Sequence, residues 1–165
     1  MNRFIAVEHK KCTGCRTCQL LCSLYHFGES NPTKSAVRVI RMERDGLVNS
    51  FPLVCQQCEP APCIDVCPTQ AISRDETGTL KFNRDDCTMC EDCVEACPVG
   101  AIAITADKGL INCDLCDGEP QCVPACHASC LSVVESDTAA KKNPDHLVGI
   151  LKQNNLLERA TGRRG

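Results

Sequence analysis

Apolar residues occur along this chain in short alternating runs, a pattern that predicts β-strands rather than long amphipathic helices. The segment Phe4–Glu8 is expected to form a first strand. The run 36–43 (AVRVIRME) alternates apolar and charged residues, and Asp45-Gly46 separates it from the run Leu47–Val54. An Asp-Gly pair between two alternating runs is a strong hairpin signal. We therefore predict a β-hairpin here, which either covers a site, meets a partner or is a surface feature with no function of its own.

Further along the chain, short strands alternate with cysteine-rich loops. Residues 69–86 (TQAISRDETGTLKFNRDD) predict a strand, a turn at Gly78 and a second strand over Thr79–Phe82. A further strand is expected over Ala101–Thr105. The order of cysteine loop, short helix, strand, turn, strand and second cysteine loop is an internal repeat.

The C-terminal segment has a different character, because it contains no cysteine and is basic. Asn143-Pro144 is a helix-start signal and Gly162 is a stop signal, so we expect a helix over Asp145–Ala160. Its apolar face would carry Leu147, Ile150, Leu151 and Leu157. We expect residues 137–165 to dock onto a partner subunit, with packing on their own domain as the alternative.

Composition limits the class of protein. The chain has 165 residues and 17 cysteines, but only four Phe, one Tyr and no Trp. The N-terminus MNRFIAVEHKKC lacks an apolar signal region and a cleavage site, and an odd number of cysteines suits disulfide pairing poorly. No run approaches the roughly 18 apolar residues of a membrane span. We therefore expect one cytoplasmic domain with reduced cysteines and no membrane span, although export with a signal-carrying partner stays open.

Sixteen of the cysteines form four groups of four. The first and third groups have the spacing C-x2-C-x2-C-x3-C that is typical of bacterial iron–sulfur proteins. In such a group three thiolates hold one cubane cluster, whereas the fourth faces away and ligates a different one. The spacing therefore predicts four [4Fe-4S] clusters. The groups are Cys12, Cys15, Cys18 and Cys22; Cys55, Cys58, Cys63 and Cys67; Cys87, Cys90, Cys93 and Cys97; and Cys113, Cys116, Cys122 and Cys126.

Structural zinc is the main alternative, because C-x2-C pairs also build tetrahedral zinc sites. A zinc site takes two pairs separated by a loop and has no use for a third cysteine three residues further on. The ending C-x3-C-P, which occurs at both Cys67 and Cys97, counts further against zinc. Thiolate is also the soft ligand that iron–sulfur chemistry requires.

Two residues near the last group leave alternatives open. Cys130 aligns with Ala71 and Ala101 of the preceding groups, so we expect a buried small residue beside a cluster, with a ligand role as the alternative. His127 replaces the proline that follows Cys67 and Cys97. It is either an exposed residue or a hydrogen-bond partner of a cluster sulfur.

Charge and motif content indicate electron transfer without catalysis. Each oxidised cubane with four thiolates carries two negative charges, so four of them lower the formal charge of −3 to about −11. This charge argues against nucleic acid and favours basic docking surfaces on redox partners. The sequence contains no Ser-His-Asp arrangement, no open metal site and no nucleotide-phosphate loop, and Cys130 has no base identified beside it. Bond making is therefore left to a partner.

With these motifs, the chain resembles the four-cluster, ferredoxin-like electron-transfer subunits of anaerobic oxidoreductases. The segments CTGCRTCQLLCSLYHFGESNP, CQQCEPAPCIDVCPTQAI and CDLCDGEPQC look most like the small subunit that accompanies tungsten-pterin enzymes of the aldehyde oxidoreductase family. That group includes the dearomatising benzoyl-CoA reductases. The resemblance covers about residues 4–135. Ser23 and His127 depart from the pattern by replacing proline.

The resemblance implies a nested pairing of the groups. The first group pairs with the fourth, and the second pairs with the third. One cluster would take Cys12, Cys15, Cys18 and Cys126, and a second would take Cys22, Cys113, Cys116 and Cys122. A third would take Cys55, Cys58, Cys63 and Cys97, and the fourth would take Cys67, Cys87, Cys90 and Cys93.

Repeat and resemblance together imply an α+β, ferredoxin-like fold. It would consist of two nested dicluster modules in residues 1–136, with the hairpin as an insertion and residues 137–165 as a helical tail. The implied partner is a large catalytic subunit of the tungsten-pterin type. A further flavin or ferredoxin partner and self-association stay open. The alternatives are a freely diffusing polyferredoxin, or a subunit of a formate dehydrogenase or hydrogenase.

The scarcity of large apolar side chains predicts that the clusters form much of the core. We expect the chain without iron to be largely unfolded, as small metal-bound domains are when the metal is removed. Far-UV circular dichroism of the chain before and after anaerobic chelation of iron measures this. Retention of the full native spectrum in the iron-free chain would contradict the prediction.

Overall fold

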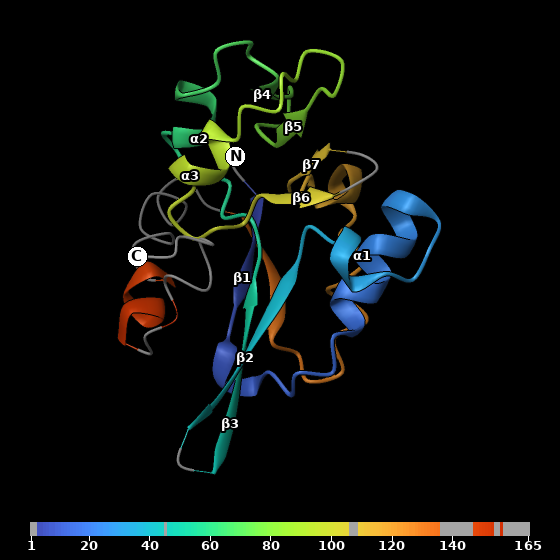
Figure 1. The fold of residues 1–165 in the computed structure, drawn as a ribbon. Helices are drawn as coiled ribbons and strands as arrows, with labels where there is room; N and C mark the ends of the chain where they lie inside the picture. The colour runs from blue at the N-terminus through green and yellow to red at the C-terminus, as the bar shows by residue number, and fades with distance from the viewer. Residues whose placement is uncertain (1–2, 45, 106–108, 136–146, 154–155, 157–165) are drawn as a thin grey trace.

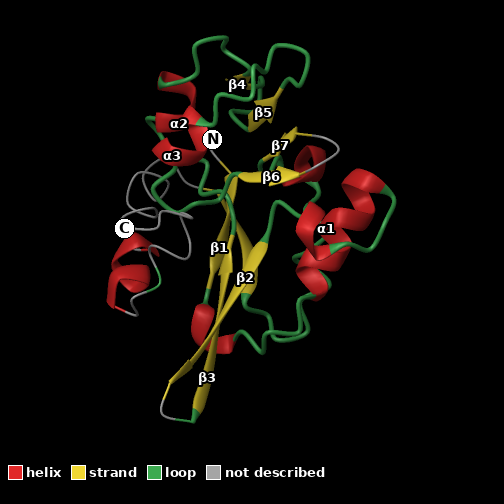
Figure 2. Ribbon diagram, viewed as in Figure 1, coloured by secondary structure: helices red, strands yellow, loops and turns green. Residues whose placement is uncertain are grey.

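The computed structural model describes residues 3–44, 46–105, 109–135, 147–153 and 156. Short helices and antiparallel strand pairs alternate along the chain, as expected for an α+β fold (Figure 2). The strands are β1 (Arg3–Val7), β2 (Arg38–Arg44), β3 (Leu47–Leu53), β4 (Ile72–Arg74), β5 (Leu80–Phe82), β6 (Ala103–Thr105), β7 (Gly109–Ile111) and β8 (Leu131–Glu135). The helices are α1 (Thr17–Phe27), α2 (Pro62–Asp65) and α3 (Asp92–Ala96), with 3-10 turns η1 (His9–Lys11), η2 (Pro32–Lys34) and η3 (Leu115–Gly118).

The strands form four separate two-stranded antiparallel sheets. Three of them are hairpins of consecutive strands, whereas β1 pairs with β8 from the other end of the cysteine-rich region. The register runs from Arg3 opposite Glu135 to Val7 opposite Leu131. Figure 1 shows the β2–β3 hairpin extending from one end of the molecule, with α2, α3, β4 and β5 gathered at the other end. The β1–β8 pair therefore brings the first and last cysteine groups together.

The predicted hairpin is present as β2 and β3, joined by the two residues Asp45 and Gly46. Its outer end is exposed, because Leu47 and Val48 are 68% and 47% exposed, respectively. Its base is buried at Phe51, where the ring stacks on His9 with centroids 5.3 Å apart. The hairpin thus belongs to the core at one end and projects from it at the other.

The strand predicted over Ala101–Thr105 begins later, at Ala103. The backbone N–H of Ala101 donates instead to the Sγ of Cys97 at 3.2 Å. That donor is therefore directed at a sulfur atom rather than at a neighbouring strand.

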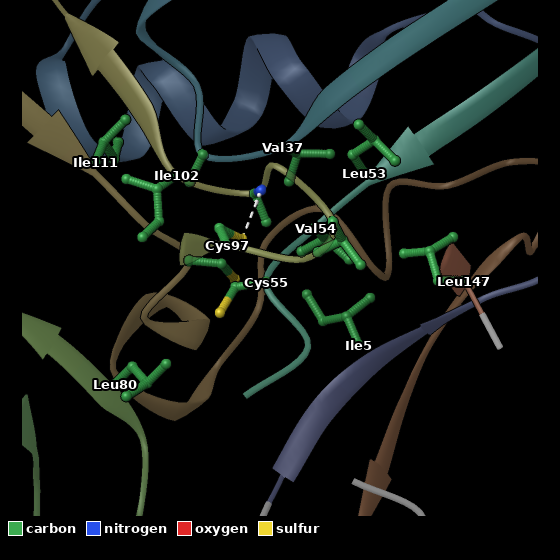
Figure 3. Close-up of a cluster of buried hydrophobic side chains, with 14 of the residues drawn as sticks. Ile5, Val37, Leu53, Val54, Cys55, Leu80, Cys97, Ile102, Ile111 and Leu147 are labelled. Atoms are coloured by element: carbon green, nitrogen blue, oxygen red, sulfur yellow. Dashed lines mark hydrogen bonds between the residues drawn. The ribbon is translucent and has the colours of Figure 1, made fainter. Parts of the chain in front are cut away.

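The hydrophobic core combines aliphatic residues from most parts of the chain with buried cysteines (Figure 3). Ile5, Leu53 and Val54 lie on one side of Cys55 and Cys97 in this core, and Ile102 lies on another. Between the cysteine loops, the buried side chain of Gln57 donates to the carbonyl of Cys113 at 2.7 Å and accepts from the N–H of Leu80 at 2.8 Å. A buried amide with both ends satisfied fixes the position of these loops.

Part of the C-terminal helix predicted over 145–160 is described, and residues 147–153 are helical. Leu147 and Leu151 are buried in the same core as Ile5, and so is Leu156 beyond the helical turns. The rest of the predicted helix, including Leu157, lies outside the described residues. The described leucines thus pack on the chain's own core.

The close contact between the first cysteine loop and the hairpin generates a prediction. Gly14 has φ +71°, and a Cβ added there would meet the Oγ of the buried Ser50. Gly28 has nearly the same φ, +70°, with nothing within 4 Å. We expect Gly28→Ala to cost about 1 kcal/mol through backbone strain, and Gly14→Ala to cost roughly 1–3 kcal/mol more through overpacking. Anaerobic urea unfolding of the two variants measures the difference. Equal losses would show that Gly14 and Ser50 do not pack this closely.

Candidate metal centres

The sixteen grouped cysteines gather in four places, here named pockets A, B, C and D. Pocket C is a cavity lined by Cys55, Cys58, Cys63 and Cys97. Three of these come from the second group and one from the third. Cys58 is half-buried and the other three are buried. The rest of the lining is mainly apolar and includes Ile72, Leu80, Val99 and Ile102.

Pocket D is lined by Cys67, Cys87, Cys90 and Cys93. Here the second group supplies one cysteine and the third supplies three. Cys93 is buried, whereas Cys90 is exposed. Each of pockets C and D thus takes three cysteines from one group and its fourth from the group that supplies the other pocket.

Pocket A is lined by Cys12, Cys15, Cys18 and Cys126, together with Cys130. The first group supplies three of the cysteines and the fourth group supplies Cys126. Cys15 is exposed, as Cys90 is in pocket D.

Pocket B consists of Cys22, Cys113, Cys116 and Cys122, all of them buried. Their thiols are electrostatic neighbours, because burial and the thiolates of Cys22 and Cys116 raise the pKa of Cys122 to about 12. Burial is also the main cause that raises the pKa of Cys113, followed by the charge of Cys55 and then by those of Cys122 and Cys22. The sequence-predicted sets are therefore all brought together in space.

Local backbone geometry explains how three cysteines of a group reach one pocket. Arg16 and Glu91, which directly follow Cys15 and Cys90, both adopt the left-handed conformation, with φ of 61° and 67°. Each stands at the N-terminus of a helix, α1 or α3, that carries the next cysteine of its group. This reversal turns the loop back over the start of the helix. Left-handed non-glycine residues cost roughly 1–2 kcal/mol, so other interactions must hold them.

The thiols destabilise one another's charged forms. Burial and neighbouring thiolates raise the pKa of Cys18 and Cys63 to about 12 and that of Cys93 to about 11. A group of four buried thiolates is therefore stable only if a cation compensates the charge. Metal binding to such a group releases protons and couples to folding.

Electrostatic contacts between cysteines link pocket A to B, pocket B to C and pocket C to D. Cys18 of pocket A contributes to the raised pKa of Cys122 in pocket B, after burial and the other cysteines of pocket B. Cys55 of pocket C does the same for Cys113 of pocket B, after burial. The charge of Cys93 in pocket D likewise contributes to the raised pKa of Cys63 in pocket C, after burial and the nearer cysteines. The two end pockets contain the exposed cysteines Cys15 and Cys90, whereas the inner two are largely buried.

Cys130 is buried, as predicted, and its position matches those of Ala71 and Ala101. The N–H of Cys130 donates to the Sγ of Cys126 at 3.4 Å, as the N–H of Ala101 does to Cys97. Burial would raise the pKa of Cys67, but hydrogen bonds from Thr69 and from the N–H of Ala71 lower it. The same backbone donor thus follows a cysteine in three of the four groups.

His127 is exposed, which agrees with the first alternative left open by the sequence, and it also lies beside a cysteine sulfur. Its Nδ1 lies 3.9 Å from the Sγ of Cys15. Its Nε2 lies 3.4 Å from the Oγ1 of Thr13.

Sequence reasoning missed a second histidine. The Nε2 of His26, in α1, lies 4.0 Å from the Sγ of Cys116 and 3.4 Å from the Oδ1 of Asp114. Hydrogen bonds to the thiolates of Cys116 and Cys22 raise the pKa of His26 to about 10. Cys22 and His26 are four residues apart, which is about one helical turn. This spacing was the only signal in the sequence that places the two side chains on the same face of the helix.

Comparison with known proteins identifies the class. Residues 47–136 match the family model of the 4Fe-4S dicluster domain. The chain belongs to this family and is an iron–sulfur protein that binds [4Fe-4S] clusters. In the described part of the chain, no helix is both long and apolar enough to cross a membrane.

Relatives of the chain carry names from electron transfer. The polyferredoxin-like subunit of aliphatic sulfonate oxidoreductase from Pyrococcus furiosus is 43% identical over 126 residues, covering 75% of this chain and 71% of the relative. The electron transport protein HydN of Escherichia coli K12 is 38% identical, with 82% and 89% covered. Formate hydrogenlyase subunit 2 of the same organism is 29% identical, with 86% of each chain covered.

Among solved structures, the active site complex BamBC of benzoyl-coenzyme A reductase with benzoyl-CoA contains a similar chain. It is 25% identical, covers 98% of each chain and has a TM-score of 0.47. The family and the curated relatives together define an iron–sulfur protein of the electron-transfer type.

The position of His26 generates a prediction. Hydrogen bonds to cluster sulfurs favour the more negative, reduced state. We therefore expect His26→Leu to lower the reduction potential of one cluster. A loss of about 1 kcal/mol of hydrogen bonding corresponds to roughly 40 mV for one electron. Anaerobic redox titration followed by electron paramagnetic resonance measures the shift.

Tyr25→Phe is the matched control on the same helix, because the Tyr25 hydroxyl contacts Asp117 rather than a thiol. It should leave all potentials unchanged. An unchanged potential in His26→Leu would show that the histidine does not act on the cluster.

Proposed function

We propose that this chain is the electron-transfer subunit of an oxidoreductase complex and holds four [4Fe-4S] clusters, one in each pocket. The observation that carries the proposal is the gathering of sixteen cysteines into four sets of four, with each group giving one cysteine to its partner group. In this proposal Cys126 completes the cluster of the first group and Cys22 completes that of the fourth. Cys97 completes that of the second group and Cys67 that of the third.

The residues present fit this cofactor. Each pocket offers four sulfur donors, which suit iron in tetrahedral sulfur coordination. The rest of pocket C is lined mainly by aliphatic side chains, which exclude water and competing oxygen ligands. Backbone N–H groups are directed at the sulfurs of Cys97 and Cys126, where they would stabilise a negatively charged centre.

The order of the pockets supports conduction from one end to the other. Clusters bound in pockets A to D would accept and pass single electrons, which is the chemistry that this cofactor supplies. The chain insulates the inner pockets by burying their cysteines and leaves Cys15 and Cys90 accessible at the two ends. The protein itself would carry out no bond-making step.

Chain topology supports two nested dicluster modules. Pockets C and D take their cysteines only from residues 55–97, whereas pockets A and B combine cysteines of the first and last groups. The pairing of β1 with β8 holds the two parts of the module with pockets A and B together. The four-cluster domain would then span residues 1–136.

The proposed partner is a large catalytic subunit of the tungsten-pterin type, in the cytoplasm. The sequence resemblance supports it, and the Pyrococcus relative is named as a subunit of an oxidoreductase. A formate dehydrogenase or hydrogenase partner is the second candidate, because formate hydrogenlyase subunit 2 is similar over 86% of this chain. A freely diffusing polyferredoxin is the third.

Two segments are proposed to dock the large subunit. The outer end of the hairpin exposes Leu47 and Val48, and the hairpin also lines pocket A through Val39 and Pro52. The second segment is the tail, residues 137–165. Its Leu147 and Leu151 pack in the chain's own core. Docking would therefore use the other side of this helix, where Lys152 is exposed.

Anaerobic purification from the native cell, followed by elemental analysis, tests the proposal. We expect about 16 iron atoms and as many sulfides per chain, and tungsten in a co-purifying large subunit. Molybdenum or nickel in place of tungsten would favour the second candidate. Iron without a partner would favour the free carrier, and zinc without sulfide would overturn the proposal.

The same purification with Lys152→Glu, which leaves the buried Leu147 and Leu151 in place, tests the tail. We expect less of the large subunit to co-purify while the iron content per chain stays unchanged. Retention of the large subunit would contradict a docking role for residues 137–165.

A further inference from the structure

Pocket A contains a fifth thiol that the four-cluster assignment does not use. Cys130 lines this pocket together with Cys12, Cys15, Cys18 and Cys126. Its side chain is only 3% exposed, and its Sγ lies 3.4 Å from the Sγ of Cys126. Cys130 also interacts with the thiol of Cys12. The fifth sulfur therefore lies among the proposed ligands rather than behind them.

The internal repeat shows what is special about this position. Ala101 stands four residues after Cys97 and donates its N–H to that sulfur, just as Cys130 does to Cys126. Ala71 stands at the corresponding place, four residues after Cys67. Of these three positions, only the one in pocket A carries a sulfur atom. Packing alone does not require this sulfur, because alanine fills the equivalent positions.

The distance between the two sulfurs makes exchange possible. At 3.4 Å the Sγ atoms of Cys126 and Cys130 are in contact, and both side chains have a single rotatable bond to the sulfur. The two sulfurs are therefore close enough to compete for the same iron atom.

We propose that Cys130 is a reserve ligand of the cluster in pocket A and replaces Cys126 at the same iron atom when that bond is lost. The inference rests on the proposed function, because it requires a cluster in pocket A. The exchange forms one iron–sulfur bond at Cys130 and breaks one at Cys126. A proton passes from the Cys130 thiol to the released Cys126 thiolate. No electron is gained or lost.

Iron and sulfide per chain, measured on anaerobically purified variants of the full chain, test the proposal. We expect Cys126→Ala and Cys130→Ala each to retain all of the iron. The double variant should lose about one quarter of it, which corresponds to one of four clusters. Cys97→Ala is the matched control in pocket C and should also lose about one quarter, because Ala101 has no sulfur to offer.

Each outcome decides between the alternatives. A loss of one quarter or more of the iron in Cys126→Ala overturns the reserve role and leaves Cys130 as a packing residue. A loss in Cys130→Ala also overturns it, because the residue would then be required and not in reserve. Full iron in Cys97→Ala would show that three cysteines suffice to hold a cluster, so retention of iron in Cys126→Ala would no longer support a ligand role for Cys130, and the proposal would fall. In the retained cluster of Cys126→Ala, an altered electron paramagnetic resonance signal would report the new ligand geometry.

Discussion

Buried thiols that repel one another when charged are the constraint on which the rest of this structure depends. Cys55, Cys63 and Cys97 lie together in an aliphatic environment, and burial and their mutual charges raise the pKa of the first two. Such a site is costly for the chain alone and becomes favourable only with a positively charged metal centre. The short helices, the left-handed turns and the hairpins can be understood as the means by which a small chain places four such sites without a conventional aromatic core.

Much of the fold could be predicted from the sequence, because its signals are local. The hairpin of β2 and β3 follows from alternation around an Asp-Gly pair, and the β4–β5 pair follows from the turn at Gly78. The four sets of cysteines also come together as the spacing and the family resemblance implied. In each case the residues of a short motif determine the local structure, so the motif can be recognised in the sequence.

Long-range features were harder to predict. The strand β8 has only five residues, and its partner β1 lies at the other end of the domain, so nothing nearby in the sequence indicates the pairing. His26 and Gln57 look like ordinary polar residues in the sequence, and only the fold shows that one lies beside Cys116 and the other beneath Cys113. The late start of β6 has a similar reason, since a sulfur atom takes the N–H of Ala101.

The pairing of β1 with β8 has a consequence for the order in which the protein can be made. A ribosome releases the chain from the N-terminus, and residues 55–97 contain every cysteine of pockets C and D. All cysteines of pockets C and D are thus available while synthesis continues. Pockets A and B have their full set of cysteines only once Cys126 and the strand after it have emerged. The topology therefore sets an order of assembly, in which a chain interrupted after Cys97 contains every cysteine of pockets C and D but lacks part of the set for pockets A and B.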